Sequence, residues 1–155
     1  MRKEFVMRGQ VKDFKSTSAA GNPAIEVLNF GKYKLGTAYR ITEFQLFPSA
    51  NIAAQPYEIT GSLTAGKTPL DPENPDFTDE GLIATGLVAT STSQPANEEL
   101  VVINDTYMIT QNLLLTCTDT HGNPVNWQCR FESVKMTAAE EAAVNFKQFT
   151  ISDGS

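Results

Sequence analysis

Apolar and polar residues alternate along much of this chain with the two-residue period of a β-strand. The alternation is strictest near the C-terminus, where polar residues separate Val125, Trp127, Cys129 and Phe131. A strand needs this pattern when one of its faces lies in a core and the other in water. Weaker versions of the pattern predict further strands, at residues 4–7, 10–14, 25–30, 38–47, 56–65, 81–90, 99–104, 106–110 and 112–119.

The segment AYRITEFQLF shows how the pattern assigns side chains to faces. Phe44 and Leu46 fall on one side of this predicted strand. The other side carries Glu43, Gln45 and Phe47. Because one side is apolar and the other mostly polar, we expect a half-buried strand.

The strongest local prediction is a β-hairpin. A cluster of turn residues, HGNP, separates two apolar runs within residues 112–136. A hairpin centred on this cluster places Cys117 opposite Cys129. It also places Leu115 opposite Phe131, so that register and polarity pattern agree.

One helix is expected after the last strand. Thr137 is followed three residues later by Glu140, which forms a capping box, and residues 138–147 are mostly good helix formers. The predicted helix has about three turns and needs packing to be stable. Residues 149–155 return to a β-like and then terminal composition.

These elements predict one all-β domain over residues 1–155. The chain has 155 residues, which is an ordinary length for a single domain. Only 19% of its residues are charged, and the polar balance comes from Thr, Asn, Gln and Ser, which suit strands and turns. We therefore expect an antiparallel β-sandwich, similar to a jelly roll, with one short C-terminal helix and a long loop at residues 66–81.

The charge of the chain is unevenly distributed. The net charge is −6, and residues 1–40 carry eight basic and three acidic side chains, so their balance is +5 and the remainder carries −11. Residues 1–15 contain five bases and two acids. We interpret them as a candidate assembly arm that contacts the acidic body of another copy. The alternative is a solvated basic terminus.

Several partner classes are not expected. No run approaches the roughly 20 apolar residues that span a membrane. The opening MRKEFVMRGQVKDF has no apolar signal segment, so we expect a protein made and assembled in the cytosol. The basic residues show no interleaving with aromatic residues and no recognition-helix pattern, so nucleic-acid binding is not predicted either.

One motif matches a nucleotide-binding pattern. Residues 61–68, GSLTAGKT, fit the phosphate-loop pattern G-x-x-x-x-G-K-[ST] at every position. That loop requires a helix at its Lys-Thr end, but Pro72 and Pro75 follow within the next two turns. The strand before it alternates, whereas a phosphate-loop strand is continuously apolar. We therefore interpret the match as a coincidence and predict no cofactor.

Metal sites are weakly supported. His121 is the only histidine and falls in a turn, so neither a zinc cluster nor a Ser-His-Asp site is predicted. A second candidate is the acidic stretch 71–80, whose carboxylates are ligands that Ca²⁺ prefers. It does not match an EF-hand loop, and we favour a solvated loop with Ca²⁺ binding as the alternative. Its acidic residues are Asp71, Glu73, Asp76, Asp79 and Glu80.

Three further side chains could carry chemistry. Cys117 and Cys129 are interpreted as buried thiols, with a cross-strand disulfide as the alternative, because their spacing lacks the geometry of a C-x-x-C redox pair. Trp127 shares its phase with Cys129, which predicts a core position in preference to ligand stacking. The sequence thus predicts no catalytic, cofactor-binding or metal-binding residue, and no enzyme.

Segments along most of the chain resemble small virion structural proteins of marine bacteriophages. This resemblance implies a capsid-associated structural protein with a β-sandwich fold, present in many symmetric copies. It assigns no role to individual residues. The segments that carry it are MRKEFVMRGQ, AYRITEFQLFPS, YEITGSLTAGKTPLDPENPDF, VVINDTYMITQNLLL, NPVNWQCRFESVKM and FKQFTISDGS.

The sequence therefore predicts a structural protein of a virus particle, either a capsid protein or a decorating or minor virion protein. Its expected partners are other copies of itself and other virion proteins, with no small-molecule substrate. Such a protein acts through extended symmetric interfaces. The alternative is a β-sandwich module that binds a small ligand or a glycan, and this would show a pocket with exposed aromatic side chains.

Overall fold

The structure is a computed structural model of the chain. It describes residues 3–15, 24–30, 36–49, 57–66, 69–90 and 98–154, with the backbone alone over 147–154. Most of the loop expected at 16–24 and of the turn expected at 31–36 lies outside these ranges, as do Lys67 and Thr68 of the phosphate-loop match.

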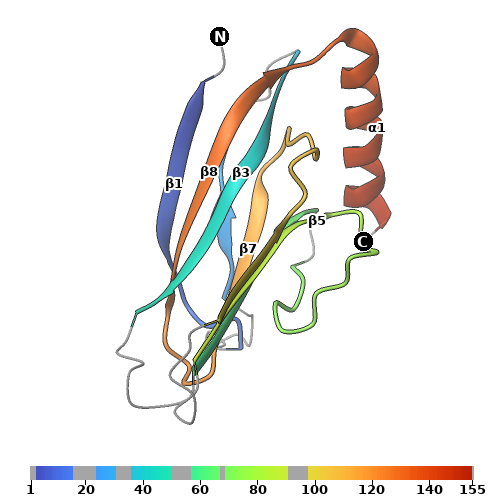
Figure 1. The fold of residues 1–155 in the computed structure, drawn as a ribbon. Coiled ribbons are helices and arrows are strands. Elements are labelled where there is room, and N and C mark those ends of the chain that lie inside the picture. The colour runs from blue at the N-terminus through green and yellow to red at the C-terminus, as the bar shows by residue number, and fades with distance from the viewer. Residues whose placement is uncertain are drawn as a thin grey trace.

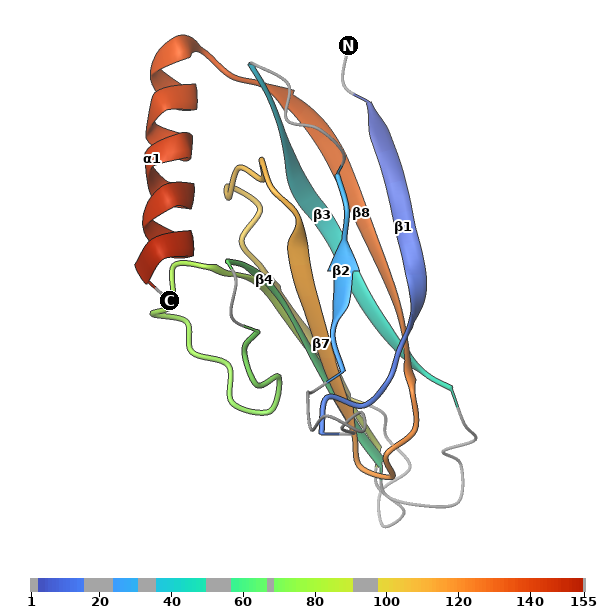
Figure 2. The same cartoon turned by 180° about the vertical axis from the view of Figure 1, so that it is seen from behind.

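Two antiparallel sheets form a sandwich, as Figures 1 and 2 show from opposite sides. The first sheet has the order β1-β8-β3, with bounds Glu4–Val11, Val125–Lys135 and Thr37–Pro48. The second has the order β2-β7-β4-β5-β6, with bounds Glu26–Leu28, Leu113–Asp119, Tyr57–Ala65, Leu82–Thr90 and Glu98–Ile103. The predicted all-β sandwich is confirmed.

The strand order is that of a jelly roll with one modification. β1, β8 and β3 are neighbours in one sheet, and β2, β7, β4 and β5 are neighbours in the other. β6 pairs with β5, and the chain that follows it crosses to the edge of the first sheet. There Ile109 and Tyr39 exchange two backbone hydrogen bonds of 2.7 and 2.9 Å. The separate strand expected at 106–110 is thus reduced to this bridge.

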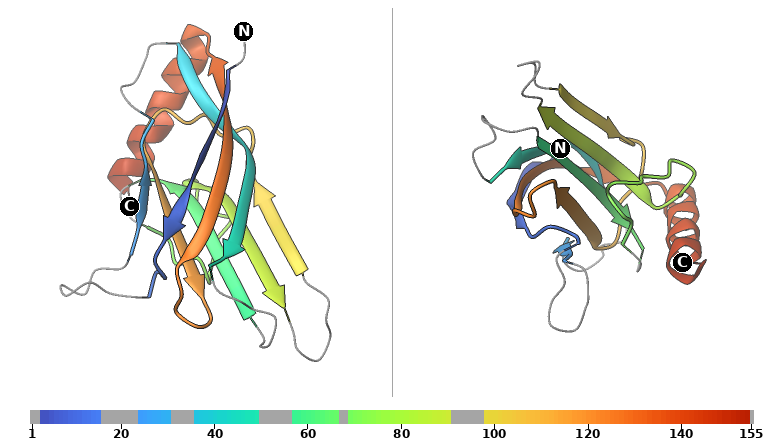
Figure 3. Two further views of the ribbon diagram at one scale, coloured as in Figure 1. Left: turned by 90° about the vertical axis from the view of Figure 1, so that its left-hand side faces the viewer. Right: turned by 90° about the horizontal axis from the view of Figure 1, so that it is seen from below.

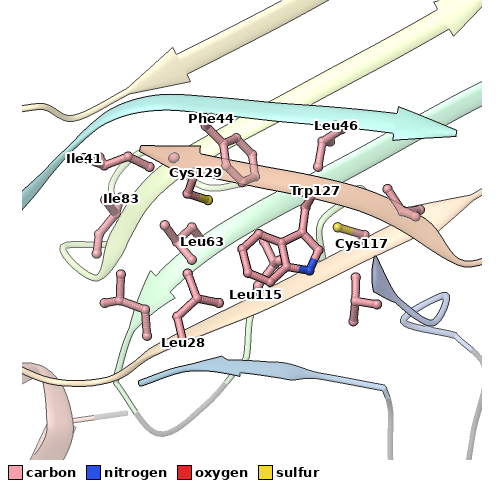
Figure 4. Packing of buried hydrophobic residues seen from close by; sticks show 14 of the residues in the cluster. Leu28, Ile41, Phe44, Leu46, Leu63, Ile83, Leu115, Cys117, Trp127 and Cys129 are labelled. Carbon is pink, nitrogen blue, oxygen red and sulfur yellow. The ribbon is translucent and has the colours of Figure 1, made fainter. Parts of the chain in front are cut away.

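The core lies between the two sheets and is built from the inward positions of the alternating pattern (Figure 4). Phe131 and Leu115 are fully buried, and Trp127 is 6% exposed. Phe44 and Leu46 are buried while Phe47 is exposed, so the predicted faces of that strand are confirmed. Alternation therefore predicted correctly which side of β3 and of β8 would meet the other sheet.

The two sheets approach each other closely at Gly61 in the centre of β4. A Cβ atom built there would lie 2.9 Å from Cδ1 of Leu46 and 3.0 Å from Sγ of Cys117. Any side chain at this position would have to displace core atoms. The first glycine of the phosphate-loop match therefore has a packing role.

The predicted hairpin over residues 112–136 is wrong. Its two strands, β7 and β8, lie in different sheets, and the turn between them carries the chain across the sandwich. Cys117 is paired with Gly61 of β4, and Cys129 with Phe44 of β3. Two strands that face each other across a core show the same alternation as two strands of a hairpin, so the pattern could not distinguish them.

Residues 4–11 are an integral strand of the sandwich. β1 pairs with β8 along its whole length. Val11 and Asp13 are buried, and the N–H of Phe14 donates to the carbonyl of Cys117 at 2.6 Å. Its own chain pairs one edge of β1, and only the other edge faces outward. The contact of residues 1–15 with another copy stays a prediction.

The helix α1 spans Ala138–Gly154 and stands along the outside of the sandwich (Figure 1). The capping box is confirmed, because Thr137 and Glu140 exchange hydrogen bonds of 3.1 and 3.2 Å. The helix continues through residues 149–154, which the sequence analysis expected to leave it. Among the described residues no helix combines the length and the apolar character needed to cross a bilayer.

Candidate functional site: an amide-rich hollow and an exposed edge strand

The outer face of the three-stranded sheet changes character along its length. Toward one end, charged side chains of neighbouring strands form pairs, Arg40 with Glu132 and Arg130 with Glu43. Toward the other end, uncharged amides replace them in two rows across β1, β8 and β3. We call these six residues the amide face; the rows are Arg8–Gln128–Gln45 and Gln10–Asn126–Phe47.

The amide face forms the wall of a hollow of about 700 Å³. Leu46 and Trp127 contribute to its lining from below, together with Gly9 of β1. The described residues that line it include one cation, Arg8, and no carboxylate. Phe47 stands at one side of this hollow with 70% of its surface exposed.

A β-bulge in β3 sets the orientation of this face. The register between β3 and β8 shifts between Ile41 and Glu43, which inserts one extra residue into β3. The insertion allows Ile41 and Phe44, three residues apart, both to be buried. As a consequence Gln45 and Phe47 point outward beside β8.

Few of the polar groups on the amide face are engaged within the chain. Nε2 of Gln10 donates to Oδ1 of Asn126 at 3.0 Å, and Nδ2 of Asn126 donates to the carbonyl of Pro48 at 3.4 Å. Within the part of the chain that the structure describes, no carboxylate lies within ion-pair distance of Arg8. The face thus presents free donors and acceptors to solvent.

Trp127 lies beneath the β1 side of the hollow. A Cβ atom built on Gly9 would lie 3.1 Å from Cζ2 and 3.3 Å from Nε1 of the indole ring. Glycine therefore allows β1 to pass close over the ring. Nε1 is buried without a hydrogen-bond partner among the described residues. The predicted core position of Trp127 is confirmed.

A second distinctive surface is the edge strand β6, which Figure 3 shows in yellow at the outer edge of the five-stranded sheet. Its middle residues are apolar and exposed, with Leu100 at 60%, Val101 at 37% and Val102 at 50%. We call these three residues the β6 edge. Proteins normally protect such an edge with charges, prolines or a covering segment, because it can pair with another chain.

The turn that contains His121 is held by a buried polar cluster. Tyr57 donates a hydrogen bond from its hydroxyl to Asp119, whose carboxylate also accepts the backbone N–H of His121 at 2.7 Å. The N–H of Asp119 donates in turn to Oδ1 of Asp13 at 2.9 Å. Burial, and then the hydrogen bond to Asp119, raise the pKa of Tyr57 to about 12. This cluster anchors the crossing between β7 and β8.

The acidic loop uses its carboxylates to shape its own turns. Asp71 accepts the backbone N–H of Glu73, Asp76 accepts that of Thr78, and Asp79 accepts that of Gly81. The two hydrogen bonds from Thr78 lower the pKa of Asp76. No group of three or more His, Cys, Asp or Glu side chains within the described ranges is arranged to share a metal ion.

The described part of the phosphate-loop match, residues 61–66, consists of a strand and its end. Residues 61–65 lie inside β4, where their backbone pairs with β5 on one side and β7 on the other. Residues 69–81, which follow the match, form turns and no helix. The backbone N–H groups of residues 61–65 therefore belong to a sheet strand and do not form a phosphate-binding loop.

Both cysteines are buried free thiols in the core (Figure 4). Burial is the main cause that raises the pKa of the thiol in Cys117 and in Cys129. For Cys117 the electrostatic influence of the nearby Cys129 is the second cause. The interpretation of these residues as buried thiols is confirmed.

Comparison with models of protein families, with curated proteins and with solved structures finds no match to this chain.

Neither surface can be recognised as a site from the sequence. The alternating pattern places Gln45 and Phe47 on the polar side of a strand, but it gives no sign that β1 and β8 align their own amides beside them. The polar positions Asn126 and Gln128 indicate only a solvated face. The one available signal was Phe47, a large apolar residue at an outward position.

Proposed function

We propose that this protein is a non-catalytic structural component of a virus particle, which works by contact with other copies of itself and other virion proteins. The resemblance to virion proteins supports this proposal, and so does the jelly-roll strand order, which occurs in viral capsid domains as well as in lectins. Because one fold hosts many functions, a function has to be inferred from a particular surface. That surface is the β6 edge.

The β6 edge fits a second copy of itself. Two antiparallel β6 strands related by a two-fold axis join two five-stranded sheets into one, and they satisfy the open backbone groups of both edges. Side chains that lie opposite each other in such a pair share a face of the sheet. With the axis at Val101, Leu100 therefore lies opposite the second copy's Val102.

Charge selects this register over its neighbour. With the axis at Val101, Glu99 lies opposite the second copy's Ile103, and Glu98 opposite its Asn104. With the axis at Leu100, Glu99 would lie opposite Val101 and Glu98 opposite Val102. The first register makes three apolar pairs and places the carboxylates at the ends of the interface, where water reaches them.

A shell needs more than one contact per subunit. The free edge of β1 faces away from β8, and the residues next to it include Lys3, Arg8 and Lys12. We keep the contact between residues 1–15 and the acidic part of a neighbouring copy as a second element of the proposal, one that joins pairs already formed through the β6 edge and does not hold two copies together alone. It now uses the open edge of an ordered strand.

Native mass spectrometry of the full chain tests the proposal, with Leu100→Glu as the variant. We expect wild-type protein to form dimers or larger symmetric assemblies at micromolar concentration, and L100E to be monomeric, because a carboxylate would be buried in the new interface. Val27→Glu is the matched control, since Val27 is 53% exposed on β2, the opposite edge strand of the same sheet. A monomeric wild type, or assembly lost equally in V27E, would contradict the proposal.

Engineered disulfides test the register. Val101→Cys would place two thiols opposite each other across the axis, at a Cβ separation of about 4.5–5.5 Å. We expect V101C to form a covalent dimer under mild oxidation and Leu100→Cys alone to form little. A mixture of L100C and Val102→Cys chains should cross-link. Preferential self-linking of L100C would instead show that the axis passes through Leu100.

A further inference from the structure

We propose that the amide face binds an acidic polysaccharide, with a uronate carboxylate on Arg8, sugar hydroxyls on the amides and a sugar ring against Phe47. This is a binding activity separate from assembly through the β6 edge, and it develops the glycan-binding alternative for one named surface.

The amides match the hydrogen-bonding requirement of a sugar. Each hydroxyl both donates and accepts, and an Asn or Gln side chain offers two donors and one acceptor oxygen. Gln10 and Asn126 are already fixed relative to each other by their 3.0 Å hydrogen bond. Gln45 and Gln128 sit side by side in the next row. Four amides within two adjacent rows thus form a grid of donors and acceptors on a rigid sheet.

Phe47 supplies an apolar contact next to this grid. Its side chain is 70% exposed on a strand whose neighbouring residues, Leu46 and Pro48, are at least half buried. Aromatic rings at ligand sites provide a large contact area at low cost in conformational entropy. The C–H face of a pyranose ring is a flat apolar surface that such a ring can cover.

Arg8 gives the site its preference for an acid. It is the one charged residue on the amide face. Of the acids farther along the outer face, Glu43 and Glu132 are engaged by Arg130 and Arg40, and Glu4 lies in the row of Glu132, beyond the row of Glu43. A guanidinium forms two parallel hydrogen bonds to a carboxylate. Because the whole chain carries −6, general attraction of polyanions is not expected, and binding would depend on this local cation.

The shape of the hollow favours a chain over a small molecule. The hollow runs across all three strands from β1 to β3, and both of these are edges of the sheet. An oligosaccharide can therefore enter and leave at either side. A compact ligand would instead need an enclosed pocket that covers most of its surface.

Isothermal titration calorimetry of the full chain tests this inference. The probes are oligogalacturonate and alginate oligosaccharides, with cello-oligosaccharides and dextran fragments as neutral references. We expect at least one uronate to bind with a measurable dissociation constant and the neutral sugars to bind at least about tenfold more weakly. Arg8→Gln and Phe47→Ala should each raise the uronate dissociation constant about tenfold or more.

Two matched control variants make the same kinds of change at sites distant from the amide face. Phe77→Ala removes a similarly exposed phenylalanine, at 63%, from the acidic loop. Lys15→Gln removes one positive charge that lies beside Glu73. Both controls should bind like wild type, and so should L100E.

Three results would overturn the inference. The first is the absence of binding to every uronate at millimolar concentration. The second is equal binding of neutral and acidic sugars that R8Q does not change, which would show that the sugar carboxylate does not contribute to binding. The third is unchanged uronate binding in F47A, which would place any site elsewhere. If F47A instead lowered the native assembly mass without affecting sugars, the amide face would be a protein interface.

Discussion

Tyr57 is the single residue whose chemistry gives the clearest dependence on pH. Its hydroxyl is buried and donates to Asp119, and its pKa is raised to about 12 from an ordinary value of 10. A raised pKa in the folded state means that its stabilising contribution is complete below pH 10. The contribution is then lost as the pH rises through about 12, because the unfolded state releases this proton first.

Tyr57→Phe isolates that contribution. We expect the variant to lose about 1–3 kcal/mol of unfolding free energy at neutral pH, because Asp119 loses a buried donor. The difference between wild type and Y57F should shrink between pH 10 and pH 12. Urea denaturation at several pH values measures it. A difference that stays constant through this range would show that Tyr57 titrates normally.

Cys117 and Cys129 should be unreactive in the folded protein. The thiolate is the nucleophile, and burial keeps both thiols protonated. We expect a maleimide to label the native protein only at the rate at which it opens, and labelling to become fast in denaturant. Replacing both residues with Ala should cost on the order of 1 kcal/mol each and leave assembly intact. Ser should cost more, because its hydroxyl would be buried unpaired. Rapid labelling of native protein would contradict this account.

At the scale of elements, β1 and α1 differ in how closely they are packed into the sandwich. β1 pairs fully with β8 and passes over Trp127, whereas the described side chains of α1 are exposed or half-exposed. The described part of α1 is tied to the sandwich by a hydrogen bond from the backbone N–H of Gly36 to Glu141. One terminal element is thus part of the core layer, and the other lies on its outside.

Two deletions test this contrast. Removing residues 2–15 should prevent folding, because it opens the core beside Trp127 and removes a buried strand end. Removing residues 138–155 should leave a folded sandwich whose thermal midpoint falls by a few degrees. Circular dichroism with thermal melting distinguishes the two. A folded, monomeric 16–155 fragment would instead restore the interpretation of the N-terminal segment as a separate arm.

The inward-facing positions of a strand can be predicted from the sequence, but its neighbours in the sheet cannot. The inward positions of β3 and β8 were predicted correctly, because burial of one face imposes a period of two. The neighbour of β7 was not, since Cys117 and Leu115 are inward-facing whether β8 lies beside them or across the core. The amide face was missed for a related reason: Arg8, Gln45 and Gln128 meet only after three distant strands align.

At the scale of the whole molecule, pairing through the β6 edge predicts that stability depends on concentration. A partner that binds only the folded state raises the apparent stability by mass action. The thermal midpoint of wild-type protein should therefore rise with protein concentration, and that of L100E should not. Scanning calorimetry over a wide concentration range measures both. A midpoint independent of concentration in wild type would mean that folding and association are uncoupled.

The bridge between Tyr39 and Ile109 connects the sheets at one side of the sandwich, and the hydrogen bond from Phe14 to Cys117 connects them at the other. Each links the chain that follows a strand of one sheet, β6 or β1, to a strand of the other sheet, β3 or β7. The two sheets therefore cannot move apart or shift relative to each other until one of these backbone hydrogen-bond links breaks. In hydrogen–deuterium exchange, the amides of Ile109 and Phe14 should record that opening of the layers, while the amides on the free side of β6 exchange by local fraying alone.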